Sequence, residues 1–498
     1  MSVSGRRLAG HIGWNILGQA APIVVALVSI PVLTRGLGPD RFGLLVLGWT
    51  FVGYFSIFDL GLAVAMERSV ARQVALGEQE RVHTTVWTTL LVMFGLGAAG
   101  FAVAWLVAPV LVHSLRASPG LQSEALTTVH LLACSIPLVI VSVGLRGVLA
   151  AHMRFRLINA IGIPLGAWTY AGPLLALPLT HSLVVMVAAL LAGRIAGFCV
   201  YAAFCVSIVP SLRRPSIDRS VVRPLLTFGG WLALDDLIDP LMGFLDRFLI
   251  GALVSVAAVA FYSVPFQLAA QGWIIASALS GVLFPLLSGM LAGGVERARV
   301  IFRRTVKYLL LGMFPGVLLL VAFAQPGLQL WLGGDYAARS AGVLQLIAAG
   351  VLITSLGSVG GTFNGGAGRP DVNAKLGLVK FALHVAPLWW VLPRFGIVGL
   401  AALWLACVSF EAAGMLVVAM RSQGVRWTHI ARRAGQFGAV LVVLGVAALD
   451  LPLAWKGVYV AAVIAAGGVV AWTRVIGPAE RRIVRRRLGF MPVAASGS

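Results

Sequence analysis

Apolar residues along this chain form long blocks of about 20 residues, separated by short stretches that hold most of the charged side chains. A helix needs about 20 apolar residues to cross the roughly 30 Å hydrocarbon core of a bilayer, because each residue adds about 1.5 Å. The pattern predicts an all-α, polytopic membrane protein with about fourteen transmembrane helices. The blocks lie near residues 12–34, 42–66, 86–112, 125–151, 157–180, 183–209, 225–252, 256–288, 305–325, 340–363, 376–393, 396–420, 433–451 and 455–473.

The block at 256–288 is unusually long and contains Pro265 and Pro285. A proline has no backbone N–H to donate, and a long apolar span fits the bilayer by tilting or kinking. We therefore expect this helix to tilt or to break at a proline.

Basic residues are distributed unequally between the two sets of loops. If the blocks cross the membrane in turn, 28 of the 38 lysines and arginines fall on the side of the N-terminus, 6 on the other side and 4 within blocks. Cytoplasmic loops carry an excess of lysine and arginine. The pattern predicts a multi-pass protein of the cytoplasmic membrane with both termini in the cytoplasm.

Composition agrees with a membrane protein and excludes other classes. The chain is 59% hydrophobic and only 11% charged, against about 25% charged in soluble domains. Its net charge of +21 is the one feature that suggests nucleic-acid binding. Because the basic residues follow the loops of one side, we expect no nucleic-acid partner.

A weak internal repeat divides the chain. Gly13-Trp14 recurs at Gly230-Trp231, an offset of 217, and Glu80-Arg81 recurs at Glu296-Arg297, an offset of 216. Six helices separate the copies, as in parallel repeats that place a substrate path between two bundles. We expect a six-helix lobe at 1–215, a second at 216–424, two extra helices at 425–475 and a basic cytoplasmic tail at 476–498.

The stretch LDDLIDPLMGFLDRFLIG, at residues 234–251, is unusually charged for a membrane helix. Each charge at the bilayer centre costs roughly 2.5–3.5 kcal/mol. Helical positions i, i+4 and i+11 share one face, so the charges form a polar stripe that we expect to line a wet cavity. The alternatives are that part of the stretch is a loop, or that its last two charges form a local ion pair. The five residues are Asp235, Asp236, Asp239, Asp246 and Arg247.

Other charges also lie within apolar blocks. Arg194 is far from either predicted surface, which favours a place in a cavity over the alternative of a buried partner for an acidic side chain. Arg146 and Lys380 are close enough to the cytoplasmic face to reach it. Asp59 and Glu411 are candidates to line the path. A proton-coupling role for His384 is less favoured than that of a packed polar residue.

Arginine suits phosphate because its planar donor fork is permanently charged. Cations from both halves therefore form a candidate site for an anionic headgroup, while the acidic stripe either neutralises them or binds a coupling cation. The candidate cationic residues are Arg146, Arg194, Arg247 and Lys380, and the candidate ion-coupling or cavity-lining residues are Asp59, Asp235, Asp236, Asp239 and Glu411.

Motifs for chemistry are missing from the sequence. It contains no G-x-x-x-x-G-K-[ST] phosphate loop, H-E-x-x-H helix or paired-cysteine spacing, so we expect no ATP, cofactor or metal site. A membrane glycosyltransferase or polymerase should carry catalytic carboxylates on a large outer loop. The longest outer loop, near 113–124, holds only Glu124, which favours a transporter over an enzyme.

Three stretches resemble the polysaccharide-unit (O-antigen and exopolysaccharide, Wzx-type) flippases of the multidrug/oligosaccharidyl-lipid/polysaccharide exporter superfamily. They are GWNILGQAAPIVVALVSIPVLTRGLGPDRFGLL, FSIFDLGLAVAMERSVARQ and DRFLIGALVSVAAVAFYSV, and the resemblance covers about residues 10–420. The motifs are an Arg-x-Leu-Gly-Pro-x-x-Phe-Gly turn, Phe-x-Asp-x-Gly and the Asp-Arg pair of the seventh helix.

This resemblance implies two pseudo-symmetric six-helix lobes around a central cavity, working by alternating access. It implies a polyprenyl-pyrophosphate-linked oligosaccharide as substrate, membrane lipids as surroundings, and polysaccharide polymerase and chain-length proteins as candidate partners. Cationic cavity residues of the family are thought to meet pyrophosphate or acidic sugars, a role that suits Arg194. A cation-coupled drug exporter and a lipid II flippase of the same superfamily stay open as alternatives.

Overall fold

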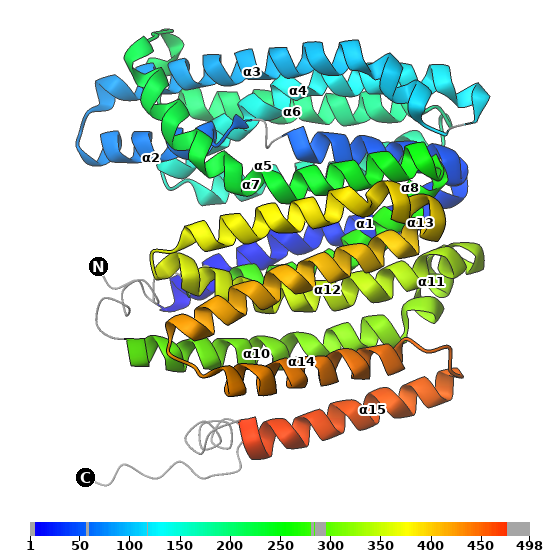
Figure 1. Ribbon diagram of the computed structural model, residues 1–498. Helices are drawn as coiled ribbons and strands as arrows, with labels where there is room; N and C mark the ends of the chain where they lie inside the picture. The colour runs from blue at the N-terminus through cyan, green and yellow to red at the C-terminus, as the bar shows by residue number, and fades with distance from the viewer. Residues whose placement is uncertain (1–4, 56–58, 117, 280–282, 284–294, 476–498) are drawn as a thin grey trace. The chain divides into compact units, whose positions relative to one another are not determined.

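The computed structural model describes residues 5–55, 59–116, 118–279, 283 and 295–475 (Figure 1). Every regular element among these residues is a helix. Within this described part of the chain, ten helical stretches are long and apolar enough to cross a membrane, which confirms the predicted all-α polytopic fold.

The chain divides into two compact units, Met1–Ser263 with Leu388–Ile397, and Val264–Pro387 with Val398–Ser498. The lobe bounds at 215, 424 and 475 stay predictions. Most of the first unit consists of α1 (Gly5–Phe55), α2 (Leu62–Ala75), α3 (Gln79–Ser114), α4 (Gln122–Ala151), α5 (Phe155–Ala176), α6 (Leu183–Ile208) and α7 (Arg219–Leu253). Most of the second consists of α10 (Val295–Ala322), α11 (Ala324–Leu332), α12 (Gly334–Gly366), α13 (Pro370–Ser422), α14 (Trp427–Ala447) and α15 (Leu453–Val470), while α8 (Val256–Ala270) runs across the boundary.

The Arg-x-Leu-Gly-Pro-x-x-Phe-Gly motif lies at a kink of α1, where Gly38 has a φ of 74°. Arg41 forms a 3.3 Å ion pair with Glu124 at the start of α4, and Glu124 also accepts a 2.6 Å hydrogen bond from the backbone N–H of Leu183. A Cβ on Gly43 would lie 2.1 Å from the carbonyl oxygen of Val256. The motif therefore connects the kink of α1 to the first residues of α4, α6 and α8.

The predicted block at 42–66 is not one helix. Leu60 and Gly61 have φ of 52° and 69°, and α2 starts immediately afterwards. The carboxylate of Asp59 accepts hydrogen bonds from the backbone N–H groups of Gly61 at 3.1 Å and Ala63 at 3.2 Å. These amides have no partner inside the helix, so the aspartate of the Phe-x-Asp-x-Gly motif stabilises a helix start that hydrophobicity alone conceals.

Helices α3, α4 and α6 lie side by side in the first unit (Figure 1). Helix α7 is continuous over Arg219–Leu253, so the alternative that its charged stretch is partly a loop is wrong. Its cap, Asp218, accepts a 2.8 Å hydrogen bond from the N–H of Ser220. The Ser220 hydroxyl, and then this N–H, hold the pKa of the Asp218 carboxyl below its usual value by hydrogen bonding to its charged form.

Loops predicted on the same side of the membrane meet in the first unit. The N–H of Asp218 donates to Thr88 at 2.9 Å and the indole of Trp87 donates to the carbonyl of Leu212 at 2.8 Å, all near one predicted surface. The N–H of Arg116 donates to the carbonyl of Gly251 at 3.0 Å near the other. These contacts agree with the predicted alternation of the helices.

In the second unit, α12 packs closely on the second part of α13, which follows a kink at Gly396 with a φ of 59°. A Cβ on Gly350 would lie 2.2 Å from the Trp404 ring, and one on Gly357 would lie 2.6 Å from the Cβ of Ala412. Small residues permit such close approach of two helices in a membrane.

The long block at 256–288 breaks after α8 at Gln271–Gly272. Pro265 lies inside α8, so the expected break does not occur at this proline, while Pro285 lies outside the described residues. The N–H of Gly272 donates to the carbonyl of Ala269 at 3.0 Å, which closes a turn that the apolar pattern does not reveal.

Candidate functional site

Two arginines within the spanning helices of the first unit lie near one tyrosine. Arg146 is exposed on α4, Arg194 is partly buried on α6, and the buried Tyr201 lies two turns beyond Arg194 on the same face. The thiol of Cys205, one turn after Tyr201, contacts the carbonyl of Leu145 at 3.3 Å. Because Arg146 follows Leu145 in α4, this contact brings the turn of α6 that holds Tyr201 close to the turn of α4 that holds Arg146.

The positive charge of this cluster is not neutralised locally. Both guanidinium groups lie within electrostatic range of Tyr201, and neither makes an ion pair or hydrogen bond with any part of the chain that the structure describes. A cation inside a membrane normally faces a partner or a wet cavity. The cluster is therefore suited to an anion supplied from outside the protein.

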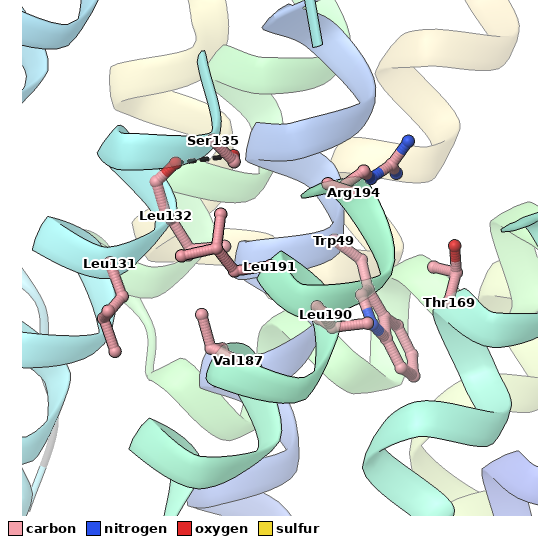
Figure 2. Close-up of a pocket in the computed structure, with 9 residues that line it drawn as sticks. All are labelled: Trp49, Leu131, Leu132, Ser135, Thr169, Val187, Leu190, Leu191 and Arg194. Carbon is pink, nitrogen blue, oxygen red and sulfur yellow. Dashed lines mark hydrogen bonds between the residues drawn. The ribbon is translucent and has the colours of Figure 1, made fainter. Parts of the chain in front are cut away.

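A small cavity of about 20 Å³ adjoins Arg194 (Figure 2). This volume is enough for about one water molecule. In the figure, Leu131 and Val187 lie on one side of the view, and Arg194, Trp49 and Thr169 lie on the other. The lining residues are Trp49, Leu131, Leu132, Ser135, Thr169, Val187, Leu190, Leu191 and Arg194.

Trp49 was not a candidate in the sequence, because an aromatic residue within an apolar block resembles any core residue. In the structure it is 8% exposed, and its ring packs edge-on to Tyr170 at 5.1 Å and to Phe42 at 6.1 Å. Tyr201 was missed for the same reason. The seven-residue spacing from Arg194, two helical turns, is the signal that indicates a shared face for Tyr201.

Arg247 is buried, at 4% exposed, on the outer part of α7. Its guanidinium donates to the carbonyl of Gly243, one turn earlier, at 2.8 Å. Its neighbour Asp246 is 2% exposed. The structure therefore places Arg247 within the packed first unit, and its role in substrate binding stays a prediction.

The acidic stripe of α7 is described only in part. Asp239 is exposed. The side chains of Asp235 and Asp236 lie outside what the structure describes, so the predicted stripe is not tested there. Asp59, expected to line the path, is 8% exposed and caps α2.

Lys380 and Glu411 lie on the two parts of α13 and form a 2.9 Å ion pair. Their side chains are only 4% and 14% exposed. His384, one turn after Lys380, is fully buried. The sequence assigned Lys380 to the substrate and Glu411 to an ion or the path, whereas the structure brings the two together, each neutralising the other.

The described residues hold no group of three or more histidine, cysteine, aspartate or glutamate side chains that could bind a metal ion. The arrangement in the first unit can bind an anion electrostatically.

Comparisons with known proteins agree on one type of protein. A model of the family described as polysaccharide biosynthesis protein matches residues 8–291. A protein of Shigella flexneri described as an O-antigen transporter is 27% identical over 409 residues, which cover 80% of this chain and 94% of that protein. The succinoglycan biosynthesis transport protein ExoT of Rhizobium meliloti is 25% identical over 359 residues, covering 68% and 65%.

Two solved structures show the fold. An inward-facing multidrug resistance MATE transporter of the MOP superfamily has a TM-score of 0.69 at 14% identity, covering 82% of this chain and 98% of that one. The lipid II flippase MurJ, in an inward closed conformation, has a TM-score of 0.66 at 12% identity, covering 96% and 99%.

Proposed function

Because this chain belongs to the family of polysaccharide biosynthesis proteins, we propose that it moves a polyprenyl-pyrophosphate-linked oligosaccharide across the cytoplasmic membrane by alternating access. The translocated oligosaccharide would then be used for O-antigen, exopolysaccharide or capsule assembly. The relatives support transport rather than catalysis, since one is described as an O-antigen transporter and the other as a succinoglycan biosynthesis transport protein. The lipid-linked form of the substrate is our inference.

The observation that carries the proposal is the unneutralised charge of Arg146 and Arg194 next to Tyr201. A pyrophosphate supplies the oxygen acceptors that two guanidinium groups can hold. Binding there offsets the cost of keeping these charges in the membrane, so the substrate headgroup and the cluster stabilise one another. The acidic residues of α7 are proposed to line the same path or to bind the coupling cation.

The predicted topology sets the direction of transport. The excess of basic residues in one set of loops favours cytoplasmic termini, so the substrate would load from the cytoplasmic leaflet. Polysaccharide polymerase and chain-length proteins would take it over on the outer side.

The test is complementation of a flippase-deficient strain that makes the matching polysaccharide. Arg194→Gln should reduce surface polymer by about tenfold or more, because a hydrogen bond to a charged group contributes about 1.5–3 kcal/mol. Arg194→Lys should have an intermediate effect, since lysine keeps the charge but not the fork. The lipid-linked precursor should accumulate in the defective cells.

The control is Arg156→Gln, an exposed arginine in the first turn of α5, which should leave polymer unchanged. Protein amount in the membrane is measured for every variant. Normal polymer in both Arg194→Gln and Arg146→Gln would reject the cationic site. Failure of the wild-type chain to restore polymer, although it is inserted and folded, would reject the function itself.

Lipid II is the alternative substrate with a structural observation behind it. The structural match with the lipid II flippase MurJ covers 96% of this chain, whereas the match with the MATE transporter covers 82%. Complementation of a strain depleted of its lipid II flippase distinguishes the two. Rescue of cell-wall synthesis there, with no rescue of surface polymer, would favour lipid II.

A further inference from the structure

An apolar cavity of about 300 Å³ lies in the second unit between α12, the second part of α13, and α14. Its walls consist of aliphatic and aromatic side chains together with one serine. The lining residues are Leu352, Ile353, Leu356, Ser409, Ala412, Ala413, Leu416, Val417, Met420, Ile430, Phe437, Gly438, Val440 and Leu441.

Water is a poor occupant of this cavity. Among the described lining residues one side chain is polar, that of Ser409, and it donates its hydroxyl to the carbonyl of Leu405 at 2.6 Å. A buried water needs two to four polar partners, and apolar cavities remain dry. An empty cavity would also deprive the lining of its dispersion contacts. A hydrocarbon chain satisfies both conditions.

The cavity is accessible from the surroundings of the helices. Leu441 lines it and is also 39% exposed, and the next residue, Val442, is 66% exposed. In a membrane-spanning helix, such exposed apolar residues face lipid. Lipid can therefore reach the cavity beside α14 without passing through the protein.

The dimensions fit one leaflet of a bilayer. From Ile430 to Leu441 the lining of α14 covers twelve residues, whose eleven helical steps of about 1.5 Å span about 16 Å. The lining of α13, from Ser409 to Met420, has the same length. This is about half of the roughly 30 Å hydrocarbon core, as expected for one acyl chain. A polyprenyl carrier is longer than one leaflet.

One end of the cavity is basic. Met420 and Ile430 line that end, and Arg421, Arg426 and Arg432 each lie within four residues of one of them in the chain. The sequence contains no acidic residue between Glu411 and Asp450. Arg421 also stacks on the ring of Trp427 at 4.9 Å, an aromatic residue of the kind that marks the headgroup level. Between residues 412 and 449, the part of the chain that forms this end of α13 and α14, a phosphate would therefore meet arginines and no carboxylate.

We propose that this cavity holds an acyl chain of an anionic phospholipid from the bilayer, with its headgroup at the Arg421, Arg426 and Arg432 end. The lipid fills the space between α14 and the helices α12 and α13. This site is separate from the Arg146–Arg194 cluster and does not depend on the transported substrate.

The test is native mass spectrometry of the full chain purified in mild detergent. Gly438 lines the cavity and has no atom within 4 Å of a Cβ built on it, so the first carbon of the Gly438→Leu side chain has room, and we expect the rest to take up cavity space. We expect the wild type to retain one phospholipid, and Gly438→Leu to retain it about tenfold more weakly, which corresponds to losing roughly two buried methylenes. Gly445→Leu is the matched control, because Gly445 is on the same helix, is equally open and is outside the cavity.

Arg432→Ala tests the headgroup. It should shift the retained lipid from phosphatidylglycerol towards phosphatidylethanolamine when both are supplied in equal amounts, whereas Arg339→Ala, remote along α12, should not. Three results would overturn the proposal: no phospholipid on the wild type, equal retention by Gly438→Leu and Gly445→Leu, or a retained mass that matches a polyprenyl carrier. None of these measurements involves transport, so they are independent of the proposed function.

Discussion

Charged side chains inside the spanning helices have different local surroundings. Lys380 and Glu411 neutralise one another, and Arg247 donates a hydrogen bond to a carbonyl of its own helix. Asp59 accepts hydrogen bonds from two backbone N–H groups. Arg146 and Arg194 have no such partner among the described residues. At the scale of the residue, this difference separates the charges with a local structural role from the best candidates for an anionic ligand.

Breaking the Lys380–Glu411 pair should be costly. Lys380→Met removes the ammonium group that pairs with the largely buried Glu411 carboxylate, which we expect to destabilise the protein by about 3 kcal/mol. The double variant Lys380→Met with Glu411→Leu should recover most of this loss, because it buries neither charge. Unfolding by SDS in mixed micelles measures both effects.

The control for this comparison is Lys375→Met, which removes the exposed 3.0 Å pair with Asp371 on the same helix. Exposed pairs contribute little, so its stability should hardly change. Equal stability of Lys380→Met and Lys375→Met would contradict the role assigned to the buried pair.

The two hydrogen bonds of Asp59 give a second prediction at this scale. Asp59→Ala removes both acceptors at the start of α2 and should cost about 1–2 kcal/mol. Asp59→Asn keeps one acceptor oxygen and should cost less. Thermal unfolding in detergent ranks the three proteins, and an alanine variant as stable as the wild type would show that Asp59 is not needed as a cap.

At the scale of the element, hydrophobic block length predicted where most helices lie but not where they break. The block at 42–66 divides at Asp59–Gly61 and the block at 256–288 divides at Gln271–Gly272. Both breaks depend on turns of three or four residues, whose effect on hydropathy is too small to interrupt an apolar run. The Phe-x-Asp-x-Gly motif does indicate the first of these breaks, because its aspartate caps α2 and its glycine adopts a positive φ.

Close packing of α12 on α13 gives a prediction about glycine. A Cβ on Gly357 would lie 2.6 Å from the Cβ and 2.8 Å from the Cα of Ala412, so Gly357→Ala should force the helices apart and cost about 1–3 kcal/mol. Gly312→Ala on α10 is the matched control, since nothing lies within 4 Å of its added Cβ. The control should gain about 0.5–1 kcal/mol from helix propensity.

The same micelle titration measures both glycine variants. If Gly312→Ala lowered the stability, the higher helix propensity of alanine would not stabilise α10, contrary to this expectation. A neutral Gly357→Ala would show that α12 and α13 can move apart without cost.

At the scale of the whole molecule, the distribution of basic residues predicts sidedness. Alkaline phosphatase fused after His181, between α5 and α6, should be active, because that loop is predicted to lie outside the cytoplasm. Green fluorescent protein fused at the C-terminus should be fluorescent, because it folds in the cytoplasm. The reverse pair of results would invert the orientation and contradict the positive-inside reading.

The sequence by itself determined the membrane class, the approximate helix positions and the positions of the charges within them. These properties depend on local hydrophobicity and on the fixed rise of a helix. Only the tertiary structure decided which charges are neutralised, because partners such as Arg41 and Glu124, 83 residues apart, meet through folding. For the same reason, the tertiary structure alone identified Tyr201 beside Arg146, Trp49 beside Arg194, and the apolar cavity under α14.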